Sequence, residues 1–243
     1  MSTHGKAYRT AKAAVDRERA YTPLEAIRLL KELVTAKFDE TIEAHFRLGL
    51  NVRHADEQLR GTLMLPHGTG REVRVAVFAE GDKAREAEEA GADVVGAQDL
   101  AKRIQDGFDE FDVAIATPDL MNVVGQLGRI LGPAGKMPNP KVGTVTMDVA
   151  KAVEESKAGK VEYRTDRTAI VHLVIGKASF DDRRLLENYA AVIDELIRAK
   201  PSAAKGRYLR SVTLTSTMGP GVKVDSSRTR DIIEEAPAAG IAA

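Results

Sequence analysis

Two kinds of strand pattern occur in this chain, and together they restrict its fold more than any other feature. From Phe38 to Leu50, apolar residues alternate with polar ones, as in a strand with one buried and one solvated face. The runs VRVAVFA from Val73 and FDVAIA from Phe111 are almost continuously apolar, as in parallel strands covered on both faces. Because the two sheet types belong to different architectures, we expect two folding units.

The alternating pattern lies at both ends of the chain. A capping box at Thr22 and Glu25 predicts a helix to about Val34, just before the first alternating strand. The alternation returns in residues 161–164 and 169–175, which we expect to form a hairpin around 165–167, before a helix at 182–199 and a strand at 208–215. Residues 73–158 between them read as alternating strands and helices, including a helix from Asp119 to about Leu131.

The expected fold class is therefore an α+β split domain with an inserted three-layer α/β (Rossmann-like) domain, a two-domain, hinged arrangement. The predicted boundaries are 1–67 plus 160–225 for the discontinuous α+β domain and 68–159 for the insert. Residues 226–243 are polar and then small and apolar, so we expect a disordered tail.

Composition excludes several classes of protein. The chain has no cysteine, so disulfides, thiolate metal sites and cysteine nucleophiles are ruled out, and its five histidines form no metal-ligand spacing. We expect no cofactor and no metal. No apolar run reaches the length of a membrane span and no secretory signal begins the chain, so a cytoplasmic protein without membrane contact is predicted. Nucleophile elbows, HExxH helices and Ser–His pairs are absent, which argues against an enzyme.

The net charge of zero is unevenly distributed. Residues 71–157 contain 11 Lys and Arg against 16 Asp and Glu, a net charge of −5, so the remainder of the chain carries +5. If the two flanks fold together, they form a basic domain interrupted by an acidic one, which favours a polyanionic partner for the flanks. The basic residues near the N-terminus are expected to form a loosely ordered arm; they are Lys6, Arg9, Lys12, Arg17 and Arg19.

A glycine- and proline-rich basic loop, GQLGRILGPAGKMPNPKVG, runs from Gly125 to Gly143. Glycines permit positive φ and prolines fix φ, so the loop is expected to have few conformers. Its spacing does not fit a phosphate-binding Walker loop, since Met137 stands where the hydroxyl is needed, and it lacks the dinucleotide fingerprint. Its single sign of charge is compatible with a phosphate or RNA neighbour, and equally with a clamp between domains.

Two clusters outside this loop suit RNA contact. In TSTMGPG from Thr215 to Gly221, small hydroxyls and glycines would let a backbone approach a sugar–phosphate strand, although an ordinary β-turn explains the run as well. Lys37, Phe38 and Thr41 combine a charge, a ring and a hydroxyl, yet strand parity alone would bury Phe38. Arg164 and Arg167 bracket the expected hairpin turn and are secondary candidates.

Three of these runs closely resemble the signature of the universal large-subunit ribosomal protein family called L-one. They are the Gly/Pro loop, KFDETIEAHFRLGLN at 37–51 and SVTLTSTMGPGVKV at 211–224. The chain departs from the family at Ala134, where an arginine is common, and at Lys136, where an apolar residue is common.

The resemblance implies a split domain that binds large-subunit (23S) rRNA and an insert that swings about a hinge near Pro66 and Gly159. It places the RNA contacts at Ser211, Thr215, Thr217, Met218 and Gly219, with the cluster of Lys37, Phe38 and Thr41 beside them. Arg164 and Arg167 are added as second-rank RNA candidates because the flanks are basic, although a solvated surface pair would look the same. The resemblance further implies a monomer when free, which joins the large ribosomal subunit as its mobile stalk, assists release of exit-site tRNA and represses its own mRNA leader. The alternative is a small-molecule-binding α/β protein that uses the inserted domain.

Overall fold

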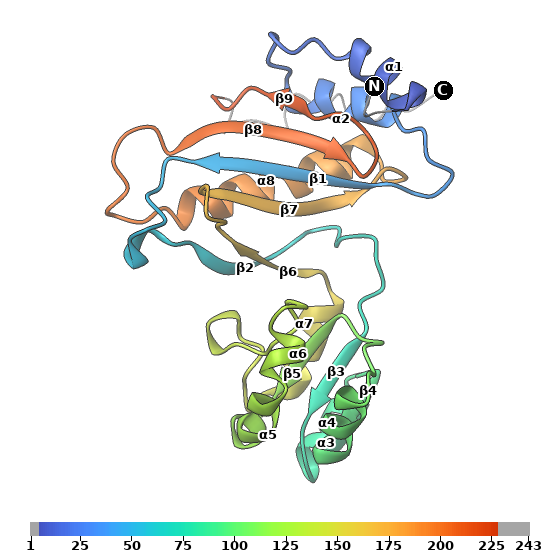
Figure 1. Ribbon diagram of the computed structural model, residues 1–243, viewed down its shortest axis with the longest axis vertical. Coiled ribbons are helices and arrows are strands. Elements are labelled where there is room, and N and C mark those ends of the chain that lie inside the picture. The colour runs from blue at the N-terminus through green and yellow to red at the C-terminus, as the bar shows by residue number, and fades with distance from the viewer. Residues whose placement is uncertain (1–4, 228–243) are drawn as a thin grey trace, which may run out of the picture. The chain divides into compact units, whose positions relative to one another are not determined.

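The computed structural model describes residues 5–227, which form two compact units (Figure 1). One unit, here called the split unit, contains residues 5–70 and 163–227; the other, the inserted unit, contains residues 71–162. Most of the predicted tail, residues 228–243, lies outside the described residues.

The split unit is built on a four-stranded antiparallel sheet in the order β7-β1-β8-β9. Its strands are β7 (Ile170–Lys177), β1 (Thr41–Leu48), β8 (Leu209–Ser216) and β9 (Val222–Val224). The central strand β1 comes from the first part of the chain, and both of its neighbours come from the last part. The sequence prediction of half-buried antiparallel strands is confirmed.

One face of this sheet is covered by the helices α2 (Pro23–Glu32) and α8 (Asp182–Arg198), the latter drawn behind the strands in Figure 1. The predicted capping box of α2 is present, with Thr22 and Glu25 satisfying each other's backbone N–H groups. Phe46 is fully buried and stacks on Tyr189 of α8 with ring centroids 5.9 Å apart. Burying a side chain of this size stabilises the fold by about 1.5–3 kcal/mol.

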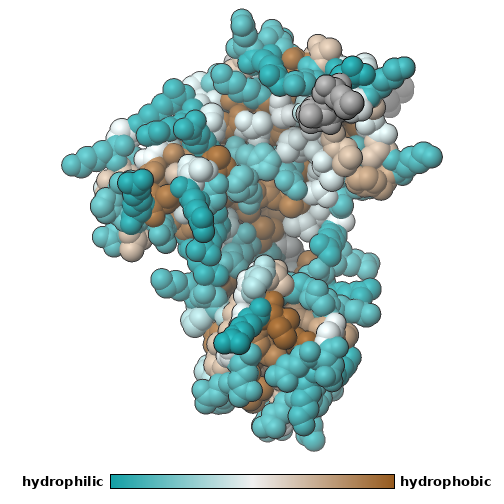
Figure 2. All heavy atoms as spheres, viewed as in Figure 1, coloured by the Kyte–Doolittle hydropathy of each residue, from teal (hydrophilic) through white to brown (hydrophobic). Residues whose placement is uncertain are grey.

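The other face of the sheet carries the polar side chains of the alternating pattern. On β1 and β8, residues at every second position are partly buried or exposed, whereas those between them, apart from Arg210, are buried. Figure 2, drawn from the same side as Figure 1, shows mostly hydrophilic residues on the visible surface. The sheet therefore presents a polar, hydroxyl-bearing surface on the side away from its helices.

The predicted hairpin around 165–167 is wrong. Strand β6 (Lys160–Arg164) forms a separate two-stranded sheet with β2 (Arg60–Met64), and only an isolated bridge between Thr165 and Val171 joins the next residue to β7. In the turn that follows β6, the Asp166 carboxylate accepts the N–H groups of residues 168 and 170, and Ala169 has φ = 61°. Strand β7 pairs with β1 instead of β6.

The basic N-terminal arm is also more ordered than predicted. Residues Lys6–Ala14 form the helix α1, and Ala11 and Val15 are buried. A spacing of four residues places these two side chains on one helix face, so burial of this face holds the segment in place. A short 3₁₀ turn, η1 (Ala55–Glu57), follows β1.

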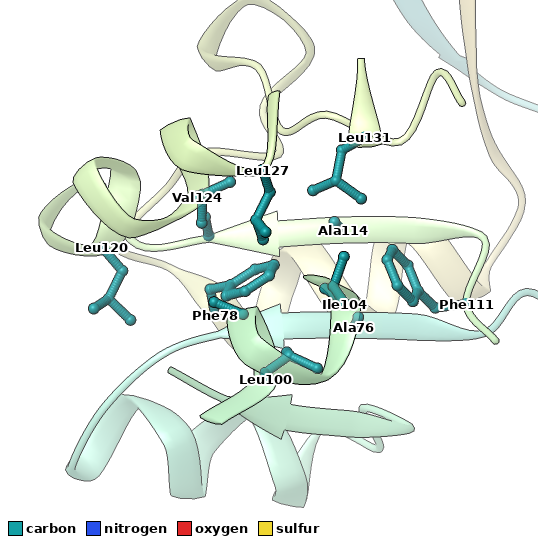
Figure 3. Packing of buried hydrophobic residues seen from close by; sticks show 12 residues of the cluster. Ala76, Phe78, Leu100, Ile104, Phe111, Ala114, Leu120, Val124, Leu127 and Leu131 are labelled. Atoms are coloured by element: carbon teal, nitrogen blue, oxygen red, sulfur yellow. The ribbon is translucent and has the colours of Figure 1, made fainter. Parts of the chain in front are cut away.

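The inserted unit contains the predicted parallel sheet, in the order β4-β3-β5. The strands are β3 (Val75–Phe78), β4 (Val94–Gly96) and β5 (Val113–Ala116). Helices cover both faces, namely α3 (Asp82–Glu89) and α7 (Val149–Lys157) on one side and α4 (Gln98–Gln105) on the other. Figure 3 shows Phe78 directed toward Val124 and Leu127 within the core of the second side.

The helix expected over residues 119–131 is divided into three short pieces. These are η2 (Pro118–Leu120), α5 (Met121–Gln126) and α6 (Gly128–Leu131). Glycine is a poor helix residue, and Gly125 and Gly128 fall near the break. The loop that follows contains η3 (Pro140–Val142), capped by the Asn139 side chain. Within residues 5–227, no helix is long and apolar enough to cross a membrane.

Candidate nucleic-acid interface

Two loops of the split unit lie together at one end of the main sheet. The first, loop A, is residues 35–40 between α2 and β1; the second, loop B, is residues 217–221 between β8 and β9. Because Ile42 pairs with Ser216, the start of β1 and the end of β8 are adjacent, as Figure 1 shows. Seven of the ten predicted RNA-contacting residues lie in these loops or at the strand ends next to them, at 37, 38, 41, 215, 217, 218 and 219.

Thr217 joins loop B to the start of β1. Its Oγ1 accepts a hydrogen bond from the N–H of Thr41 at 2.9 Å and donates one to the carbonyl of the same residue at 3.3 Å. Residue 217 is nonetheless exposed. Its hydroxyl is thus committed to holding the two segments together, a role that sequence reasoning did not separate from direct RNA contact.

The buried side chain of Glu40 connects loop A to loop B through hydrogen bonds. One carboxylate oxygen accepts the N–H groups of Thr35 and Ala36 at 3.3 and 3.1 Å, and the other accepts the N–H of Met218 at 3.1 Å. The residue is completely buried. Burial would raise the pKa of the Glu40 carboxyl, but the hydrogen bonds that it accepts hold this pKa below its usual value.

The loops expose two large apolar side chains. Phe38 is 54% exposed and Met218 is 58% exposed. Strand parity would have buried Phe38, but β1 starts only at Thr41, so the alternation does not extend to residue 38. An exposed ring and an exposed thioether beside the charged Lys37 form a surface suited to stacking and phosphate contact.

A further set of contacts fixes the outer side of loop A. The Lys177 ammonium donates to the Thr41 hydroxyl oxygen at 2.9 Å. The Asp39 carboxylate accepts from the N–H and the hydroxyl of Ser179 at 3.1 and 2.7 Å. Loop A is therefore bonded on one side to the end of β7 and on the other to loop B.

Gly219 is required by packing within loop B. A Cβ at this position would lie 2.4 Å from the Ser216 Oγ, and Ser216 is itself buried. The hydroxyl of Thr215 donates to the carbonyls of Ser216 and Gly219 at 3.0 and 3.4 Å, which closes the same turn. The small residues of this run thus have structural roles that the sequence left undecided.

The remaining three predicted residues lie toward the opposite end of the sheet. In the strand register, Arg47 of β1 lies between Ser211 of β8 and Ile170 of β7. Arg164 ends β6, and Arg167 lies in the turn between β6 and Ile170. Ser211 is four residues from Thr215, a separation of about 13 Å along a strand. The structure therefore divides the predicted residues into a loop group and a distal group.

A histidine pair occupies the polar face between these groups. His45 and His172 are directly opposite in the strand register, with their Nδ1 atoms 2.9 Å apart. Burial lowers the pKa of His45, and the neighbouring His172 lowers it further. On the other side of each ring, the Nε2 atom faces a carboxylate. The distance is 3.8 Å from His45 Nε2 to Glu43 Oε2 and 3.6 Å from His172 Nε2 to Asp166 Oδ2.

Sequence reasoning missed Glu40 and Lys177. A signal for Glu40 was available, because position 40 has the same parity as the buried positions 42, 44 and 46 of β1, and an acid in an apolar register needs hydrogen-bond partners. Lys177 gave no such signal, since its contact with Thr41 depends on the pairing of β7 with β1.

The basic Gly/Pro loop of the inserted unit has one of its charges already paired. Lys136 is bonded to Asp109, and its ammonium lies 4.9 Å from the centre of the Phe111 ring. The cation and its stem pack where an apolar residue would also fit, which explains how the chain tolerates lysine there. Arg129 and Lys141 are exposed.

Comparison with known proteins first defines the class: the chain is a ribosomal protein, and thus a structural, non-enzymatic component of the translation apparatus. More specifically, it belongs to the Ribosomal protein L1p/L10e family, whose model matches residues 30–220. The match includes all ten of the predicted RNA-contacting residues.

Three relatives, each called large ribosomal subunit protein uL1, are similar over nearly their full lengths. The Thermobifida fusca protein is 59% identical over 231 residues, covering 95% of this chain and 98% of the relative. The Rubrobacter xylanophilus protein is 64% identical over 228 residues, covering 93% and 99%. The Streptomyces coelicolor protein is 56% identical over 240 residues, covering 98% and 100%.

Proposed function

We propose that the split unit binds large-subunit rRNA and that loops A and B form the centre of the contact. The observation that carries this proposal is the joining of the loops by Glu40 and Thr217, with Phe38 and Met218 left exposed. Ordered loops with exposed apolar groups lose little conformational freedom on binding, so they provide a preformed surface for RNA.

The distal group extends this surface along the polar face of the sheet. Arg164 and Arg167 are exposed, as is Arg47 between them and Ser211 in the register. Guanidinium groups pair with phosphates, and partly exposed hydroxyls can bond to phosphate or 2′-OH groups. The distal group is separated from loops A and B along the sheet. This arrangement suits an RNA segment that lies across the sheet rather than one that contacts the loops alone.

We also propose the family's finer roles for this chain. The two-domain division predicted at 67/68 and 159/160 would allow the insert to move about its two connections while the split unit holds rRNA. The resulting mobile stalk would assist release of deacylated tRNA from the exit site. The same RNA surface would bind the leader of the chain's own mRNA and repress translation.

A deletion tests which unit binds rRNA. Replacing residues 71–157 with a short Gly/Ser linker should leave the binding of a large-subunit rRNA fragment within about tenfold of that of the full chain, provided that circular dichroism shows a folded variant. The isolated insert, which has a net charge of −5, serves as the second arm. Binding by the insert alone would reverse the assignment.

A further inference from the structure

Glu40 is the only acidic side chain among residues 5–227 that is completely buried, and it has no opposite charge beside it. Its carboxylate accepts three backbone N–H groups, two from loop A and one from loop B, and the Ser216 side chain also helps to keep its pKa low. A buried carboxylate without these bonds would be costly, so its ionised form is favoured only while both loops stay in place.

We propose that Glu40 is a positioning residue for RNA binding. Its carboxylate fixes loop A relative to loop B, and thereby sets the spacing between Phe38 and Met218. This inference rests on the proposed function, because it assigns no contact of its own to RNA. Complete burial of Glu40 prevents the carboxylate from touching a nucleotide unless the loops open.

The chemistry of the site requires a group that only accepts hydrogen bonds. All three N–H groups point at the carboxylate, so each oxygen must serve as an acceptor. A glutamine at position 40 has nearly the same shape, but its amide can accept through one oxygen only. If that oxygen serves loop A, the NH₂ group faces the N–H of Met218, and two donors oppose each other.

Charge and positioning predict opposite changes in RNA affinity when Glu40 is replaced by glutamine. Removing a negative charge close to a phosphate-binding surface should strengthen RNA binding through the long-range field. Loss of the positioning contact should weaken it. A fall in affinity on Glu40→Gln therefore cannot arise from the change in charge, and Glu32→Gln, which removes the same charge, supplies the matched control. Glu32 is exposed at the end of α2 and lies outside both loops.

The experiment measures the affinity of the full chain and its variants for a large-subunit rRNA fragment, together with amide hydrogen exchange at Met218. Glu40→Gln should weaken binding by 10- to 100-fold, mainly through faster dissociation, and should speed exchange of the Met218 amide at least tenfold. Glu32→Gln should bind within threefold of the unmodified chain or more tightly, with unchanged exchange at Met218.

Glu40→Asp covers the case in which Glu40→Gln fails to fold. It keeps the charge but shortens the side chain by one methylene, so it should reach one loop only and give the same loss of affinity and the same faster exchange. The inference is overturned if either folded variant binds like the unmodified chain, or if affinity falls while the Met218 amide stays protected. If the unmodified chain does not bind rRNA, the proposed function fails, and the exchange result still decides whether Glu40 holds loop B.

Discussion

Thr217 bonds twice to the backbone of Thr41, accepting its N–H at 2.9 Å and donating to its carbonyl at 3.3 Å. The two residues are 176 positions apart in the chain, and this contact joins the start of β1 to loop B. The first and last parts of the split unit thus meet at the proposed RNA surface. A residue whose position suggests an RNA contact therefore has a demonstrable structural task.

Thr217→Val should weaken both stability and RNA binding. Valine keeps the shape but removes both hydrogen bonds, leaving the Thr41 N–H without its partner, so we expect a loss of about 1–3 kcal/mol in the free energy of unfolding and a weaker free energy of RNA binding. Denaturant titration measures the free energy of unfolding, and filter binding measures the affinity for RNA. Thr217→Ser, which retains the hydroxyl, is the control and should stay within about 0.5–1 kcal/mol; equal losses in both variants would contradict the role of the hydroxyl.

Gly219→Ala should be destabilising because its new Cβ would lie 2.4 Å from the Ser216 Oγ. We expect a cost of about 1–3 kcal/mol from overpacking. Ser216→Ala removes the opposing oxygen. Gly219→Ala should therefore cost less free energy of unfolding in the Ser216→Ala variant than in the unmodified chain. A double-mutant cycle in thermal or urea unfolding measures this coupling, and strict additivity would show that the two sites do not clash.

The histidine pair should make stability depend on pH. The pKa of His45 is lowered in the folded chain, so below its ordinary value of 6.5 the unfolded chain takes up a proton more readily than the folded one. This histidine therefore costs no stability well above pH 6.5, and stability declines as pH falls through that value. Urea midpoints from pH 8 to pH 5 should decrease less steeply in His45→Gln, and an unchanged slope would remove the pair as the cause.

RNA affinity should fall with salt, and Lys37 should contribute to that dependence. Each neutralised phosphate adds about 0.7–0.9 to the slope of log affinity against log salt. Lys37→Ala should reduce the slope by about this amount. Lys136→Ala serves as a comparison, because Lys136 is already paired with Asp109. The salt dependence of RNA affinity should be the same in this variant as in the unmodified chain. A slope of zero for the unmodified chain would exclude phosphate contact as a main source of affinity.

Sequence patterns predicted the strands of the parallel sheet and those of the four-stranded sheet except β9, because burial sets their periodicity. The alternating strands and the continuous apolar strands each matched their sheet type. The hairpin prediction at 165–167 was wrong because β6 pairs with β2 and β7 pairs with β1, both of which are distant in sequence. A polar turn between two neighbouring strands does not reveal such pairing.

For the candidate site, sequence supplied the residue types, and the tertiary fold determined their roles. Glycine and hydroxyl residues at 215–219 fitted RNA contact and a turn equally well, and the positions of Ser216 and Thr41 decide that several of them are structural. The division of the site into loop and distal groups depends on strand register, which pairs Ile42 with Ser216 at one end and Arg47 with Ser211 at the other. No local pattern specifies that register.

Whether loops A and B bind rRNA is tested by ultraviolet cross-linking of the unmodified chain to large-subunit rRNA, with the linked peptides identified by mass spectrometry. We expect cross-links in residues 35–41 and 215–219, at Phe38 and Met218 above all, with weaker ones near Arg164 and Arg167. Cross-links confined to residues 71–162, with loops A and B unmodified, would contradict this expectation.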